Sequence, residues 1–170
     1  MTAPRPGPAE VTMNGLNELV KALAAEHAAV YAYGLVCART SGGLRTEAIA
    51  AFNAHRARRD QLRGLILARG GTPPEALPSY AVPFTPGTSA EAARLAAMVE
   101  DGVTSAYLEL AAAGEPSMRR LAALAMQESV TRSYGFRPAI AALPGFPAPS
   151  TARTPAPAPP ATPRPSRSGQ

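Results

Sequence analysis

The sequence predicts an all-α protein, a four-helix bundle in which one long crossover joins two antiparallel helical hairpins. Of its 170 residues, 37 are Ala, the residue with the highest intrinsic helix propensity. Four segments repeat apolar residues at helical spacing, and they are separated by two short gaps and one long gap. A chain of this length can bury one continuous core, so we expect a single domain.

The first hairpin is predicted over residues 14–39 and 45–69. The first helix stops at a Ser-Gly-Gly sequence (41–43), and the second stops at Gly-Gly (70–71) with Pro-Pro (73–74) beyond. About five residues join the two helices, a length typical of antiparallel neighbours.

The second hairpin is predicted over residues 88–113 and 116–143. Thr88 and Glu91 have the spacing of a capping box at the start of the third helix. Pro116 suits the first position of the fourth helix, because a proline there loses no helical hydrogen bond. Two or three residues join these helices, which again indicates an antiparallel pair.

The gap between the two hairpins decides the topology. A helix of 25 residues is about 37 Å long, and 18 extended residues can span about 60 Å. The 18 or so residues after the second helix can therefore run the length of the bundle and leave the second and third helices parallel. One long crossover is the arrangement of ferritin-like bundles. The alternation of Tyr80, Val82 and Phe84 predicts that this crossover packs apolar side chains on the bundle.

Both ends of the chain are predicted to be disordered. Residues 1–13 lack helical periodicity, and residues 144–170 contain nine Pro among 27 residues, so neither segment can bury a core. The bundle is therefore expected to occupy residues 14–143. We identify no internal repeat of fixed period.

Net charge and cysteine content argue against several classes of protein. Of the net charge of +5, the tail contributes three through Arg153, Arg164 and Arg167, while residues 14–143 hold 13 basic and 11 acidic residues. The arginines that follow His55 spread over about 160° of their helix, so they form no clean nucleic-acid face. Cys37 is the only cysteine, which excludes a disulfide framework. With no apolar run of membrane-spanning length and no leader, we expect no membrane and a cytoplasmic protein.

Each predicted helix places ionisable groups on or beside its apolar face. Burial of such groups is unfavourable unless they are paired or bind metal. One interpretation is a layer of salt bridges in which carboxylates neutralise arginines and histidines bond among them: Glu26, Glu100 and Glu128 with Arg59, Arg132, His27 and His55. Tyrosines of the bundle are expected to fill space and to direct their hydroxyls to water or to a buried carboxylate.

A second interpretation is a di-metal carboxylate site. Such a site takes one Glu from each of two helices and a Glu-x-x-His motif from each of the other two, and it holds a pair of iron or manganese ions.

Four segments carry a family resemblance: EHAAVYAYG (26–34), AHRARRDQL (54–62), GTPPEALPSYAVPF (71–84) and LAAMVEDGVTSAY (95–107). They resemble the bacterial ferritin-like domain-of-unknown-function family 4439 over about residues 14–140. The resemblance implies a ferritin-like bundle and no established reaction. It also implies which residues stand at the metal positions of the wider ferritin-like pattern: Glu26, His55, Glu100 and Glu128 match a ligand, whereas Phe52 and Thr131 do not.

The charges of the layer decide between the two interpretations. Arg59 and Arg132 beside three carboxylates leave a net charge of about −1, which is too little to compensate two divalent cations, and Arg does not deprotonate. We therefore expect an ion-pair layer with no cofactor, and keep iron or manganese at Glu26, His55, Glu100 and Glu128 as the alternative.

The resulting functional prediction is a non-catalytic binding or assembly scaffold with a degenerate metal site. Its alanine-rich faces suggest a homodimer. The alternatives are a metal-dependent oxidoreductase and an RNA-associated accessory protein.

Overall fold

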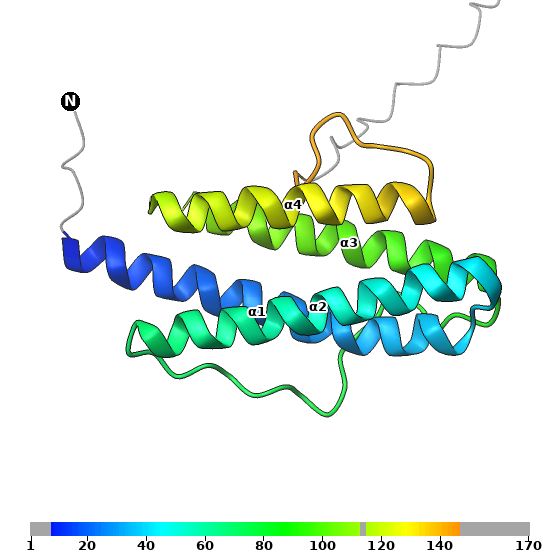
Figure 1. Cartoon of the computed structure of the whole chain (residues 1–170), viewed down its shortest axis with the longest axis horizontal. Helices are drawn as coiled ribbons and strands as arrows, with labels where there is room; N and C mark the ends of the chain where they lie inside the picture. The colour runs from blue at the N-terminus through cyan, green and yellow to red at the C-terminus, as the bar shows by residue number, and fades with distance from the viewer. Residues whose placement is uncertain (1–7, 113–114, 147–170) are drawn as a thin grey trace, which may run out of the picture.

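The computed structural model describes residues 8–112 and 115–146, with side chains from residue 15 onward (Figure 1). Within these ranges it contains four helices and no strand: α1 (Pro8–Ala38), α2 (Gly42–Ala68), α3 (Ser89–Ala111) and α4 (Pro116–Phe136). The all-α prediction is confirmed. No helix in the described ranges combines the length and the apolar character needed to cross a membrane.

The four helices form two antiparallel hairpins. In Figure 1, α2 returns alongside α1, α3 runs in the same direction as α2, and α4 returns alongside α3. Helix α1 packs against both α2 and α3, and α3 packs against α4. The predicted topology, with one long crossover between α2 and α3, is therefore observed.

Three helix ends differ from prediction by three residues or more. Helix α2 begins at Gly42 instead of residue 45, so the two glycines expected in the turn form its first residues. Helix α1 begins at Pro8, six residues before the predicted start, so part of the segment expected to be disordered is helical. Helix α4 ends at Phe136 instead of residue 143. Pro138 explains this end, because a proline disfavours helical backbone in the residue before it, and Arg137 is extended with φ −144° and ψ 103°. The predicted disorder of residues 1–7 and 147–170 lies outside the described residues.

The other helix ends follow local rules. The Thr88 hydroxyl accepts a hydrogen bond from the Glu91 backbone N–H at 3.2 Å, and the Glu91 carboxylate accepts one from the Thr88 N–H at 3.1 Å. This reciprocal pair confirms the capping box of α3. After α2, Gly70 takes the left-handed conformation (φ +75°) that favours glycine, which ends the helix.

The crossover packs apolar side chains on the bundle as predicted. The rings of Tyr31 and Tyr80 lie 5.8 Å apart, and Val82 and Phe84 pack against buried residues of the bundle. The Pro74 carbonyl lies 3.3 Å from the ring nitrogen Nε2 of His27.

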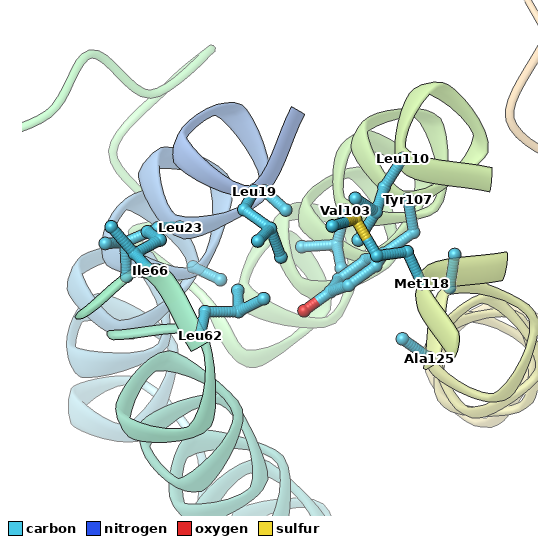
Figure 2. Close-up of a cluster of buried hydrophobic side chains, with 12 residues drawn as sticks. Leu19, Leu23, Leu62, Ile66, Val103, Tyr107, Leu110, Met118 and Ala125 are labelled. Carbon is cyan, nitrogen blue, oxygen red and sulfur yellow. The ribbon is translucent and has the colours of Figure 1, made fainter. Parts of the chain in front are cut away.

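Two apolar clusters fill the bundle. Figure 2 shows the larger one, in which the Tyr107 phenol reaches from α3 into the interior between side chains of the other helices. The second cluster lies further along the helices and includes Tyr33, Val36 and Leu95. On the buried face of α2, His55 falls between Ala51 of the second cluster and Leu62 of the first. A polar residue therefore stands between two apolar layers.

We predict that Thr88→Ala destabilises the fold by about 1 kcal/mol, because the first turn of α3 loses a bonded N–H. For a chain of this length the melting temperature should fall by about 2–4 °C. Thermal melts followed by circular dichroism measure this shift. Thr72→Ala, at an exposed crossover position, is the control, and an equal shift in both variants would contradict the role of the cap.

Candidate functional site

Three helices bring Glu26, His55 and Glu100 together in the centre of the bundle. Each residue is at most 1% exposed. The His55 nitrogen Nδ1 lies 2.7 Å from Oε2 of Glu26, and its Nε2 lies 3.0 Å from Oε1 of Glu100. Because ionised carboxylates only accept hydrogen bonds, His55 donates from both ring nitrogens, which only the protonated imidazolium can do.

Two buried tyrosines extend this chain of hydrogen bonds. Tyr33 donates to Oε1 of Glu100, and Tyr107 donates to Oε1 of Glu26, each at 2.7 Å. The tyrosine expectation is confirmed for these two residues. A continuous chain thus runs from Tyr33 through Glu100, His55 and Glu26 to Tyr107.

The fourth helix supplies Arg132. Its Nε donates to Oε1 of Glu100 at 2.8 Å, and its Nη2 donates to the hydroxyl of Ser129 at 3.3 Å. Below, the polar cluster means these six residues together: Glu26, Tyr33, His55, Glu100, Tyr107 and Arg132. Two carboxylates, one imidazolium and one guanidinium give it a net charge of zero.

The environment of His55 stabilises its protonated form. Burial alone would lower its pKa, but the hydrogen bonds to Glu100 and Glu26, together with the charges of both carboxylates, outweigh burial and raise the pKa to about 9. For Glu100, burial acts to raise the pKa, but His55 and Arg132 outweigh it and hold the pKa below its ordinary value. Burial, and then the neighbouring carboxylates, raise the pKa of Tyr33 and Tyr107, so both stay neutral donors.

The two carboxylate oxygens of Glu100 differ in their number of hydrogen bonds. Its Oε1 accepts from His55, Tyr33 and Arg132, whereas its buried Oε2 has no hydrogen-bond partner among the described residues. The three donors on one oxygen hold the carboxylate in a single orientation.

Three predicted members lie outside the polar cluster. The expectation for Arg59 is wrong: its Nε bonds Asp60 at 2.8 Å, and its side chain is 25% exposed. His27 is buried but faces the Pro74 carbonyl of the crossover, and burial lowers its pKa. Glu128 is 51% exposed and accepts from Arg58 at 2.7 Å. Its predicted pairing with Arg132 is present only at the surface, where Oε2 of Glu128 lies 4.0 Å from Nη1 of Arg132. Glu128 points outward because the buried face of α4 is formed by Ala125, Ser129 and Ser133.

A repeat that sequence reasoning missed relates the two hairpins. Positions 74 residues apart share type and burial: Ala22 and Ala96, Glu26 and Glu100, Tyr33 and Tyr107, Ala48 and Ala122, Ala51 and Ala125. By the same offset, Ser129 corresponds to His55 and Arg132 to Arg58. This offset was the available signal that Tyr33 and Tyr107 are equivalent and that Ser129, rather than Glu128, faces the interior.

Comparison with known proteins places this arrangement in a family context. A family model described as a domain of unknown function (DUF4439) matches residues 18–148, a range that includes the whole polar cluster. A crystal structure described as a conserved hypothetical protein from Mycobacterium tuberculosis is similar at a TM-score of 0.71 and 32% identity. The similarity covers 75% of this chain and 98% of that one. Among curated proteins, no match was found.

We predict that stability falls with rising pH because of His55. Its pKa is raised on folding, so its contribution is complete below about pH 6.5 and is lost as the pH rises through about 9. Each unit of pKa difference corresponds to about 1.4 kcal/mol of unfolding free energy. Urea unfolding across this pH range measures the decline.

Two histidine variants test whether His55 causes this decline in stability. His55→Gln should abolish it, whereas His27→Gln should retain it, because burial lowers the pKa of His27. A decline that survives in His55→Gln would contradict this assignment.

Proposed function

Because the chain belongs to the DUF4439 family of domains of unknown function, we propose its function from its own chemistry: it is a non-catalytic binding or assembly scaffold. In this scaffold, a charge-balanced polar cluster takes the place of the metal pair of ferritin-like bundles. The observation that carries the proposal is the pairing of His55 and Arg132 with the two buried carboxylates.

The residues present do not fit a di-metal carboxylate site. Both oxygens of Glu26 and both ring nitrogens of His55 are already engaged by protein groups. From α4, the guanidinium of Arg132 donates to Glu100, and a fixed cation at this carboxylate opposes metal binding. Across the described residues, no group of three His, Cys, Asp or Glu side chains is arranged to hold a metal ion.

One observation favours a second function. Glu26, His55 and Glu100 are metal-ligating residue types from three different helices, and they meet at the centre of the bundle. A metal-dependent oxidoreductase using iron or manganese, with Glu128 as a fourth ligand, therefore stays as the alternative. It would require Glu128 to turn from Arg58 toward the interior.

The charged surface of α2 supports a scaffold over an RNA-associated protein. Arg58, Arg59 and Arg63 pair with Glu128, Asp60 and Glu75 respectively. These ion pairs neutralise three of the arginines of α2 that would otherwise be available to contact phosphates.

The proposal also includes a homodimer and a cytoplasmic location, both carried over from the sequence. Light scattering should give twice the chain mass. The mass of a single chain at high protein concentration would contradict the proposed dimer.

We predict that Arg132→Met costs on the order of 3–5 kcal/mol of stability, because it leaves the fully buried Glu100 without a cationic partner on α4. Arg59→Met is a matched control, since its side chain is equally exposed but pairs with an exposed carboxylate, and should cost less than about 1 kcal/mol. Melts of both variants with and without chelator, after growth with iron and manganese, make the comparison.

If the chain is a scaffold, we expect chelator to leave the melting temperature unchanged and elemental analysis to find no bound metal. About two bound metal ions per chain, together with an Arg132→Met variant as stable as the parent chain, would contradict the scaffold and favour the metal-dependent alternative.

A further inference from the structure

A cavity lies beside the bundle, and no residue of the polar cluster is among its lining residues. After α4, residues 137–146, here called the strap, fold back over α3 and α4 and appear as the orange loop in Figure 1. The strap is attached by an ion pair between Arg137 and Asp101 at 2.8 Å and by a hydrogen bond from Ser105 to the Gly145 carbonyl at 2.9 Å. Between the strap and the two helices is a cavity of about 540 Å³. This volume is within the range of small-molecule sites.

Apolar side chains of the strap surround this cavity without filling it. Ile140, Leu143 and Phe146 line it, yet they are 62%, 66% and 57% exposed. Three large apolar side chains within seven residues are thus left largely in water, next to Val130 and Thr104 of the helices. An apolar ligand in the cavity would remove this surface from water, which is favourable.

The polar residues of the cavity indicate the charge of the ligand. The Asp101 carboxylate is satisfied, since Oδ1 accepts from Ser133 at 3.0 Å and Oδ2 accepts from Arg137 at 2.8 Å. Arg137 has five guanidinium N–H groups, and the described contacts use only its Nη2. The other guanidinium N–H groups of Arg137 are therefore available to donate to an anionic head group at the rim of the cavity.

We propose that this cavity binds a free single-chain fatty acid, with its carboxylate at Arg137 and its alkyl chain against Ile140, Leu143 and Phe146. This inference rests on the proposed binding function and names the ligand class of a non-catalytic site.

Calorimetric titration of the full chain with dodecanoate, below the concentration at which it forms micelles, tests the proposal. We expect saturable binding of dodecanoate and none of dodecyltrimethylammonium, which has the same alkyl chain and the opposite charge. Leu143→Ser should weaken binding about tenfold or more, because the alkyl chain loses a large apolar contact. Leu77→Ser, at a similarly exposed leucine of the crossover, should leave binding unchanged.

A second pair of variants tests the head group. Arg137→Gln should weaken dodecanoate binding about tenfold, through loss of a charged hydrogen bond, whereas Arg120→Gln on the exposed surface of α4 should not. Circular dichroism of each variant shows whether α3 and α4 stay folded.

Several results would overturn the proposal: no binding of dodecanoate, equal binding of the cationic amphiphile, or affinity that Leu143→Ser and Arg137→Gln leave unchanged. Binding only to phosphatidylglycerol vesicles would assign the surface to a membrane. Conversion of a dimer to a monomer by Leu143→Ser alone would assign it to a second copy of the chain. Bound metal in the polar cluster would overturn the proposed scaffold without changing dodecanoate binding, so the two failures are distinguishable.

Discussion

Two carboxylates without access to water require cationic partners inside this bundle. Glu26 and Glu100 are buried at the centre of four helices, where an unpaired negative charge is strongly unfavourable. His55 bonds both carboxylates at once, and Arg132 adds a second positive charge at Glu100. The arrangement ties α1, α2, α3 and α4 together through their charges, so removal of either cation affects the whole core.

The polar cluster also limits what the interior can do. Tyr33 and Tyr107 donate to the same carboxylates that His55 bridges, so most acceptor sites are already used by protein donors. Apolar layers lie on both sides of the cluster. The polar cluster therefore offers few free acceptor atoms to a ligand. The cavity beside the strap lies on the outer surface of the bundle.

Sequence reasoning was most successful where a local rule decides the structure. The capping box at Thr88, the start of α4 at Pro116 and the parallel course of α2 and α3 each depend on a few neighbouring residues or on chain length. The end of α4 differs from prediction because the apolar residues beyond Pro138 resemble a continuing helix, whereas the proline ends it at Phe136. Periodicity gave Arg59 and Arg132 similar positions, but a long side chain can turn outward, and only the folded chain shows that Asp60 attracts one and Glu100 the other.

Nitrogen NMR of the His55 side chain reports the protonation state on which the charge balance of the polar cluster depends. We predict that at neutral pH both ring nitrogens carry a proton, with each N–H coupled through a hydrogen bond to a carboxylate. A ring with one bare nitrogen, or with a nitrogen bound to a metal ion, would contradict it.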